Sequence, residues 1–420
     1  MRRNRRPHAP GAADFFGPDT SRFLDAISQI RNPIERKTPH PRVLKSMEAV
    51  LTVQSVKPEA KRLNLFERYL PIWVGLCMVV GVVLGKWAPG AVQTLRNLDF
   101  GEGTHINVPM VILIWLMIIP MMMKVDFASV RDVGRKPTGL LITLFVNWVV
   151  KPFSMAFLAW LFFRGLFSAW ISQSEADQYI AGAIILAAAP CTAMVFVWSY
   201  LTDGDPAYTL VQVAVNDLIM LVLFAPIVGL LIAGTSSLTV PFIVLLYSVI
   251  LFIVIPLTAG SLIRSWSIHT HGATWFNKVL LPTFQPMTIM ALLATLVLIF
   301  AFQADNITGK VAHVLLIAVP IILQVYFNAA LAYGLMKIWR VPYSVAAPGA
   351  LIGASNFFEL AVATAIALFG PESGAALATV VGVLVEVPVM LSVCAACNRT
   401  KSLFPQESRD ETESALSLYR

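Results

Sequence analysis

The sequence predicts an all-α integral membrane protein, and three observations carry this prediction. Of the 420 residues, 57% are hydrophobic and only 13% are charged, whereas soluble domains have about 45–50% apolar and about 25% charged residues. The mean hydropathy is +0.73. Long apolar runs follow one another from residue 70 to residue 398. So few charged side chains cannot cover a water-facing surface, which excludes soluble enzymes and nucleic-acid-binding proteins.

Two polar segments flank the apolar region. Residues 1–69 hold 14 of the 31 Lys and Arg and no long apolar run, which predicts a basic, disordered cytoplasmic tail. This segment lacks the apolar core of a signal peptide. Residues 399–420 are predicted to form a second cytoplasmic tail. The transporter-like region between them is expected to occupy residues 70–398.

The apolar runs predict the number of membrane spans. A spanning helix needs about 20 mainly apolar residues. We therefore predict ten transmembrane helices, near residues 70–88, 108–123, 138–163, 179–200, 208–233, 240–263, 276–302, 311–338, 343–369 and 372–397.

Basic residues predict the orientation of these ten spans. With both tails inside, the tails and inner loops hold 26 Lys and Arg, and the outer loops hold four. Cytoplasmic segments carry the excess of Lys and Arg in membrane proteins. We therefore expect a multi-pass protein of the cell's inner (plasma) membrane with both termini in the cytoplasm. The net charge of +7 thus reflects membrane orientation, with no nucleic acid as partner.

An internal repeat is predicted from the number and character of the spans. Ten spans divide into two halves of five, and an odd number per half makes any repeat inverted. The fourth span of each half contains a helix breaker: Pro190 in one and the stretch 353–356 (Gly-Ala-Ser-Asn) in the other. The predicted architecture is two inverted five-helix repeats with broken fourth and ninth helices.

Ionisable residues within spans cost at least about 2.5–3.5 kcal/mol each and therefore need a reason. Glu359 follows the stretch of small and amide residues, where a freed backbone lines a cavity, so it is a candidate to bind a proton or a polar solute. Glu386 precedes Pro388, and Asp217 follows Asn216. Structural hydrogen bonding is the alternative for each carboxylate. Lys151 is either the counter-ion of a buried carboxylate or a snorkelling side chain.

Cys191 directly follows Pro190. A thiolate is a soft ligand that suits thiophilic solutes, although a buried cysteine is more often a packing residue. Cys394 and Cys397 have the spacing of a redox motif but end an apolar helix, which makes their signal weak. The sequence contains no phosphate loop, catalytic motif or clustered metal ligands. We therefore expect no enzyme activity, cofactor or metal site.

Two motifs resemble the arsenite efflux permease family called Acr3, in the bile acid/arsenite/riboflavin transporter group. They are Pro190–Ser199 (PCTAMVFVWS) and Ala354–Ala361 (ASNFFELA). The supporting stretches are Pro120–Phe127, Asn147–Phe153, Val215–Ile219 and Val385–Met390. The resemblance covers residues 65–398 and leaves the basic tail outside.

The resemblance implies a function and a site. The function is export of arsenite, and in some members antimonite, in exchange for protons, which gives arsenic resistance. Cys191, Asn356 and Glu359 are the implied substrate-binding residues. Glu359, Glu386, Asn216 and Asp217 are the implied proton-coupling residues. The expected partners are the metalloid, the proton and the lipid bilayer, and the oligomeric state stays open.

Two other readings compete with this one. A sodium-coupled organic-anion carrier has the same scaffold, and Asn216, Asp217 and Glu386 would then form its cation site. A membrane-embedded enzyme or a sensor without transport is the alternative from another class. An enzyme needs a nucleophile and base or metal ligands, and a sensor needs a soluble output domain; neither is visible in the sequence.

Overall fold

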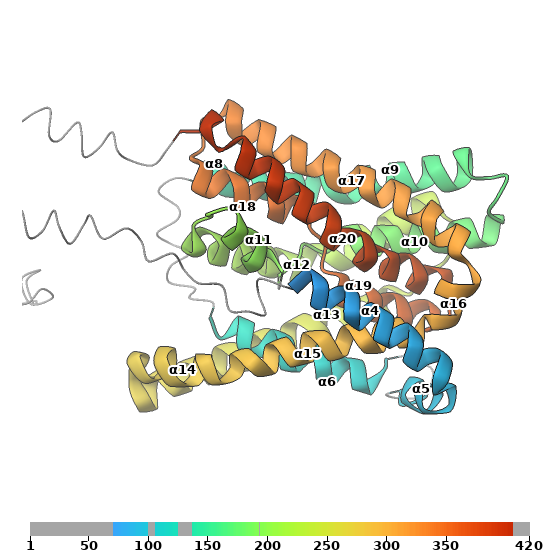
Figure 1. The fold of residues 1–420 in the computed structure, drawn as a ribbon, viewed down its shortest axis with the longest axis horizontal. Helices are drawn as coiled ribbons and strands as arrows, with labels where there is room; N and C mark the ends of the chain where they lie inside the picture. Colours follow the sequence, from blue (N-terminus) through green and yellow to red (C-terminus); the bar gives the residue numbers. More distant parts are fainter. Residues whose placement is uncertain (1–69, 100–105, 125–136, 193, 406–420) are drawn as a thin grey trace, which may run out of the picture. The chain divides into compact units, whose positions relative to one another are not determined.

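A computed structural model describes residues 70–99, 106–124, 137–192 and 194–405, all within the unit of residues 65–420 (Figure 1). The predicted N-terminal tail and residues 406–420 of the predicted C-terminal tail lie outside the described residues. Every regular element in the described ranges is helical. The β pairs among them are two isolated bridges, Asp99 with Asn107 and Pro190 with Asn356.

One group of helices, which we call the panel, forms a layer along one side of the bundle (Figure 1). Within it α15 packs against α4 and α6, and α14 packs against α6. These helices are α4 (Leu70–Trp87), α6 (Val108–Met122), α13 (Phe242–Val249), η4 (Ile250–Val254), α14 (Ile255–Trp275), η5 (Phe276–Leu280) and α15 (Leu281–Phe302).

The helical stretch from Phe242 to Phe302 is broken at Gly272. This residue has φ 83° and ψ 160°, a backbone conformation that glycine adopts without the steric cost a side chain brings. The break lies between the predicted sixth and seventh spans.

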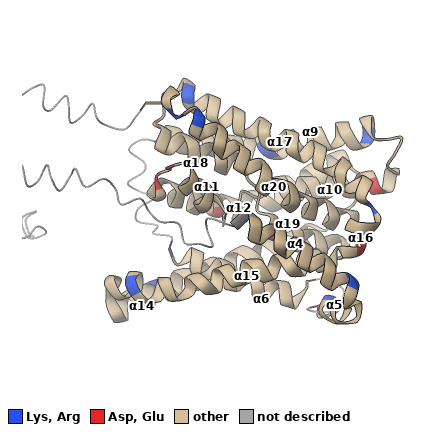
Figure 2. Cartoon of the chain, viewed as in Figure 1, with Lys and Arg blue, Asp and Glu red and all other residues tan. Residues whose placement is uncertain are grey.

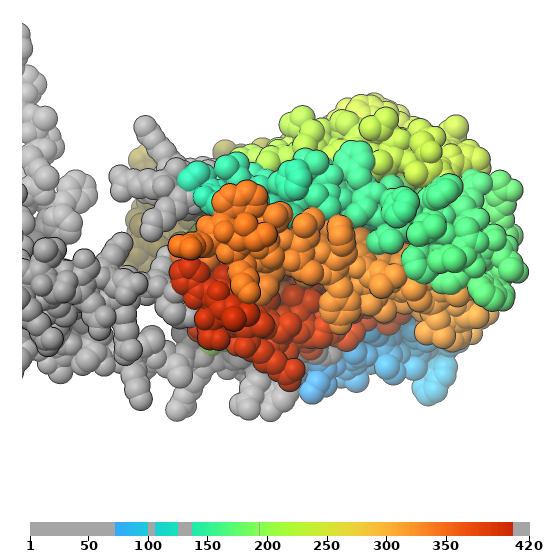
Figure 3. All heavy atoms as spheres, turned by 90° about the horizontal axis from the view of Figure 1, so that it is seen from above, coloured from blue at the N-terminus to red at the C-terminus, as the bar shows by residue number. Residues whose placement is uncertain are grey.

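The remaining helices form what we call the core. Its long members are the continuous stretch α8 (Thr138–Phe145), η2 (Val146–Val150), α9 (Lys151–Trp160) and η3 (Leu161–Leu166), with α12 (Pro206–Thr235), α17 (Val311–Ile338) and α20 (Gly374–Arg399). Figure 3 shows the stretch 138–166, α17 and α20 side by side on one face, in agreement with their contacts. They surround four short, mostly buried helices: α10 (Gln173–Ala187), α11 (Val195–Leu201), α18 (Tyr343–Ala354) and α19 (Phe358–Phe369).

Helix α10 approaches α20 very closely. A Cβ at Gly182 would lie 2.3 Å from the carbonyl oxygen of Ala375, a distance that only a residue without a side chain allows. This contact draws the first broken segment against the last helix.

The helices suit a membrane in length and surface. Helices cover most of each apolar segment predicted from the sequence, and the predicted fourth and ninth segments each contain a break. Among the described residues, five stretches are long and apolar enough to cross a membrane, or six when the pair bent by 102° at Ala88, α4 with α5 (Pro89–Arg96), counts as one span. Large apolar side chains on the long helices are exposed, including Phe157, Val222 and Leu315, as lipid contact requires. The all-α, multi-pass membrane class is confirmed, and the ten spans and their inverted repeat stay a prediction.

Charged residues gather at the two ends of the bundle (Figure 2). At one end, Arg96 pairs with Glu372 at 2.5 Å and Lys310 pairs with Glu175 at 2.9 Å. At the other end, Lys401 pairs with Asp203 at 2.9 Å. The short helices α16 (Ala304–Gly309) and η6 (Lys401–Leu403) belong to the first and second end respectively. Few charged residues lie in the middle of the bundle, so a buried charged residue there is a candidate for a functional role.

Candidate functional site

Two helix breaks meet in the middle of the core. The first separates α10 from α11 at residues 188–194, where Pro190 supplies no N–H to continue a helix. The second separates α18 from α19 at residues 355–357. Pro190 and Asn356 form an antiparallel bridge, and the Phe357 N–H donates to the Ala189 carbonyl at 2.8 Å. Each break thus satisfies backbone groups of the other, as an apolar interior demands.

Two ionisable side chains from outside the breaks hold the second break. The Lys151 ammonium, from α9, donates to the Ser355 carbonyl at 2.7 Å. The Glu386 carboxylate, from α20, accepts from the Asn356 N–H at 3.0 Å. Lys151 is completely buried and interacts electrostatically with Glu386 and with Cys191. Lys151 is therefore a buried partner of the site and not a snorkelling side chain.

Glu359 lies in the first turn of α19, immediately after the second break. Its side chain is completely buried, and neither carboxyl oxygen has a hydrogen-bond partner in another described residue. It interacts electrostatically with Glu386. The N-terminus of a helix favours a negative charge, but an unpartnered buried carboxylate is costly. Such a group is suited to bind a proton or a hydrogen-bond donor.

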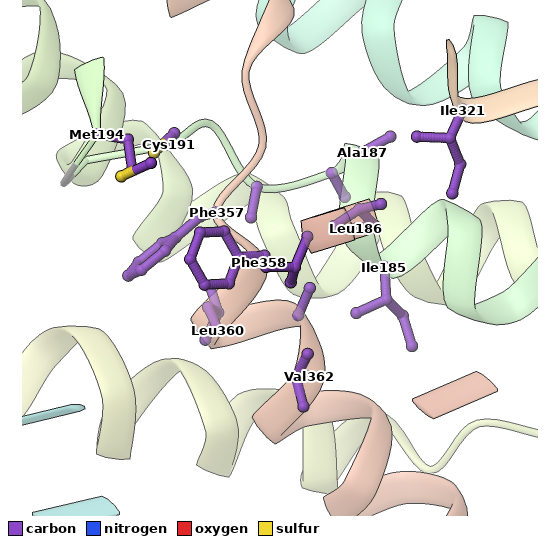
Figure 4. Packing of buried hydrophobic residues seen from close by; sticks show 14 of the residues in the cluster. Ile185, Leu186, Ala187, Cys191, Met194, Ile321, Phe357, Phe358, Leu360 and Val362 are labelled. Atoms are coloured by element: carbon purple, nitrogen blue, oxygen red, sulfur yellow. The ribbon is translucent and has the colours of Figure 1, made fainter. Parts of the chain in front are cut away.

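Cys191 lies in the first break, directly after the bridged Pro190, and is 1% exposed. In Figure 4, Cys191 and Met194 lie on one side of the crossing and Ile185 lies on the other, with Phe357 and Phe358 drawn between them. The neighbouring Thr192 is equally buried, and its hydroxyl has no hydrogen-bond partner within the described ranges. The first break therefore offers a soft sulfur beside a hydroxyl.

Asp217, on α12, faces a small cavity between core and panel. The cavity has room for about one water molecule. The core supplies Thr192, Asp217, Met220 and Phe357 to its lining, and the panel supplies Ile118, Met122, Phe252 and Ile253. Neither carboxyl oxygen of Asp217 has a hydrogen-bond partner among the residues that the structure describes. Both helix breaks thus reach the boundary along which core and panel meet.

Asn216 points into a hydrogen-bond network instead of the breaks. Its Oδ1 accepts from Asn147 Nδ2 at 3.1 Å and from Trp148 Nε1 at 3.0 Å, while its Nδ2 donates to the Gln212 carbonyl at 2.8 Å. Its Nδ2 also lies 3.3 Å from Gln212 Oε1, so the hydrogen bonds of Asn216 run to Asn147, Trp148 and Gln212. The structure therefore groups Cys191, Asn356, Glu359 and Glu386 at the crossing, places Asp217 on its panel side, and places Asn216 in the support of π-helix η2.

Several polar side chains of this region escaped the sequence analysis. Gln324 Nε2 donates to the Lys151 carbonyl at 3.4 Å, and Gln324 is completely buried. Asn328, one turn further along α17, is buried with neither amide atom hydrogen-bonded within the described residues. Amide side chains carry no charge, so a search of the sequence for ionisable residues does not find them. The available signal was the spacing of Gln324 and Asn328, two amides four residues apart in an apolar run, which places them on one face of a helix.

Comparisons with known proteins agree with this architecture. The sodium bile acid symporter family matches residues 111–310. The chain is 51% identical over 357 residues to the arsenical-resistance protein Acr3 of Alkaliphilus metalliredigens, which covers 85% of this chain and 99% of that protein. It is 44% identical over 373 residues to an uncharacterized transporter of Synechocystis sp., covering 86% and 96% of the two chains.

A more distant relative extends the same pattern. The arsenical-resistance protein Acr3 of Corynebacterium glutamicum is 30% identical over 345 residues, covering 79% of this chain and 88% of that protein. The chain therefore belongs to the Acr3 family of arsenical-resistance proteins.

Proposed function

We propose that this protein is a secondary transporter, and not an enzyme, that exports arsenite from the cytoplasm in exchange for protons and so gives arsenic resistance. Antimonite, which has the same soft, trivalent chemistry, is a second candidate substrate. The observation that carries the proposal is the crossing of two helix breaks at Pro190 and Asn356, with the buried thiol of Cys191 in the first break. The Glu359 carboxyl, which has no hydrogen-bond partner in another described residue, lies in the first turn after the second break. The relatives named for arsenical resistance support it.

The chemistry of arsenite suits this combination of groups. Near neutral pH arsenite is a small uncharged oxyacid, whose arsenic favours sulfur and whose hydroxyls need hydrogen-bond partners. Cys191 supplies the sulfur, and the Asn356 amide and Glu359 supply hydrogen-bonding atoms that lack partners in the described chain. A single thiol contact is weak enough to reverse, and a transport site must release what it binds. Three thiols would instead retain the metalloid.

The charged residues around the second break are assigned to coupling. In the proposed cycle arsenite reaches Cys191 along the boundary of core and panel, where the cavity at Asp217 lies. Movement of the panel against the core then exposes the site to the outside. A proton binds the Glu359 carboxylate, favours release of arsenite, and is carried inward. Glu386 shares this proton through its electrostatic interaction with Glu359, Asp217 is a further acceptor, and Asn216 acts by positioning η2.

The proposal includes the predicted topology. Ten spans in two inverted repeats place the stretches near residues 89–107, 164–178, 234–239, 303–310 and 370–371 outside and both termini in the cytoplasm of the inner (plasma) membrane. Ion pairs between distant loops support this alternation, because Arg96 with Glu372 joins two loops assigned outside and Lys401 with Asp203 joins two assigned inside.

Arsenic accumulation in metalloid-sensitive cells tests the proposed function. Cells expressing the chain should hold less arsenic(III) than vector-only cells, and a protonophore should abolish the difference. Membrane insertion is checked by detection of the protein in the membrane fraction. Equal accumulation in both strains, with the protein inserted, would rule out export.

The same cells separate proton coupling from the sodium-coupled alternative, which the name of the matched family favours. Replacing external Na⁺ by choline should leave arsenite export unchanged. Loss of transport in choline medium, together with uptake of an organic anion in sodium medium, would favour the carrier reading.

A further inference from the structure

Cys394 and Cys397 lie outside the proposed transport site and have no role in it. Both are on the last turns of α20, and each is 3% exposed. Residues three apart lie on one face of a helix, so these two thiols lie on one face of α20. The pair is therefore a buried dithiol, distinct in place and in number of sulfurs from the single thiol at Cys191.

The surroundings of the dithiol are polar enough to hold an oxygen-bearing ligand. Cys394 Sγ lies 4.0 Å from the Trp198 carbonyl oxygen of α11. The Tyr333 hydroxyl, from α17, donates to the Cys397 carbonyl oxygen at 3.4 Å. The Tyr343 hydroxyl, from the start of α18, donates to Oδ1 of Asn398, the residue after Cys397, at 2.9 Å. Two sulfurs and two phenol groups thus lie in the region where α11, α17 and α20 end and α18 begins (Figure 1).

A short segment, residues 401–405, packs against the two tyrosines beside this dithiol. The Phe404 ring lies 4.5 Å from the Tyr333 ring and 6.2 Å from the Tyr343 ring, and Phe404 is 4% exposed. The Tyr343 N–H donates to the Pro405 carbonyl at 3.3 Å. Lys401, which pairs with Asp203, lies over the Tyr343 ring at 5.1 Å. The segment 401–405 is held by a few contacts near the chain's end, so its displacement opens a route to the two thiols.

We propose that Cys394 and Cys397 form a second trivalent-arsenic site, which chelates the metalloid at the cytoplasmic end of α20. Arsenous acid reacts with the two thiols to form two As–S bonds and two water molecules, and arsenic keeps one hydroxyl. Each thiol proton leaves with a departing hydroxyl, so arsenic stays trivalent and no charge is left in the buried site. The described residues contain no group of three or more metal-binding side chains, and a dithiol suffices for arsenic that keeps an oxygen ligand.

Two sulfurs change the lifetime of the complex. After the first As–S bond forms, the second forms intramolecularly, which raises the apparent affinity by about 100-fold or more over a single thiol. Slow release is unsuited to turnover and suited to registering the arsenic level in the cytoplasm. Cys394 contacts the carbonyl of Trp198. Trp198 belongs to α11, the helix that follows the break containing Cys191, so α11 connects the dithiol with the transport site. The inference goes beyond the proposed function and needs no transport to be tested.

The test uses phenylarsine oxide on purified full-length protein with Cys77→Ser and Cys191→Ser, which leaves Cys394 and Cys397 as the thiols. Mass spectrometry should show one phenylarsenic group per chain with loss of one water. Excess glutathione, a monothiol, should leave the adduct in place, and dimercaptopropanol should remove it. Adding Cys394→Ser or Cys397→Ser should make loss to glutathione about 100-fold faster.

Other outcomes would overturn the proposal. One is the absence of a phenylarsenic adduct. Another is an adduct that glutathione removes at the same rate whether one or both of Cys394 and Cys397 are present. A third is a purified protein whose mass is two hydrogens below that of the reduced chain, because a disulfide between the two cysteines would indicate a redox pair instead. Phe404→Ala tests the route separately and should speed adduct formation; an unchanged rate would exclude access through the segment 401–405. None of these results depends on arsenite efflux, so failure of the dithiol site and failure of the proposed function are distinguishable.

Discussion

The two helix breaks cross each other but differ in chemistry. The first, at residues 188–194, contains no ionisable carboxyl or amine and contributes Cys191 and the Thr192 hydroxyl. The second, at residues 355–357, is bonded by the buried charged groups of Lys151 and Glu386 and leads directly into Glu359. The difference indicates a division of labour, in which the first break binds the soft substrate and the second couples binding to the proton. Variants on each side can test that division.

The largest effect is expected from the first break. Cys191→Ser keeps the size of the side chain but replaces a soft sulfur by a hard oxygen. We expect arsenite transport into everted membrane vesicles to fall to the level of vesicles without the protein, at unchanged expression. Cys77→Ser, on the panel helix α4, is the matched control and should transport normally. Normal transport by Cys191→Ser would remove the thiol from the substrate site.

A variant next to the second break should lose proton coupling but still bind arsenite. Glu359→Gln retains the shape and hydrogen-bonding capacity of the side chain but cannot cycle a proton. We expect uphill transport to disappear while arsenite still binds, and arsenite-induced proton movement in vesicles to be absent. Glu372→Gln, an exposed carboxyl at one end of the bundle, is the control. Uphill transport at the wild-type rate in Glu359→Gln would make this residue structural and move the proton to Glu386 or Asp217.

A smaller effect is expected from Glu386→Gln. The glutamine Oε1 can still accept the Asn356 N–H bond, so the break should keep its geometry, while the electrostatic attraction to Lys151 disappears. Loss of about 1 kcal/mol corresponds to a roughly fivefold slower proton-coupled transport. Initial rates at several pH gradients measure this change. A complete loss, equal to that of Glu359→Gln, would identify Glu386 as an equal carrier and not a sharing one.

The smallest effect on transport is expected outside both breaks, at Asn216. Asn216→Ala leaves Asn147 Nδ2 and Trp148 Nε1 without their common acceptor, at a cost of about 1–3 kcal/mol in stability. Thermal unfolding in detergent should shift downward, while transport per folded molecule stays within a few-fold of the wild type. Loss of proton coupling at unchanged stability would instead assign Asn216 a direct part in coupling.

Local properties of the chain predicted much of this protein. Apolar run length and the scarcity of charge predicted the helices, and Pro190 with the stretch 353–356 predicted where two of them break. Cys191 and Glu359 stood out because a thiol after a proline and a carboxylate in an apolar run are conspicuous wherever they occur. The role of Lys151 stayed open, since the sequence alone allows both snorkelling and ion pairing.

Only the tertiary structure decided how these groups meet. The Lys151 bond to the Ser355 carbonyl joins residues 204 apart, and the Glu386 bond to the Asn356 N–H joins residues 30 apart. Tertiary structure also turned the neighbours Asn216 and Asp217 toward a supporting network and a cavity at the panel, respectively. The reason is physical: helix periodicity and composition are local, whereas pairing a buried polar group depends on which distant backbone the packing of α9, α12 and α20 brings within hydrogen-bond reach.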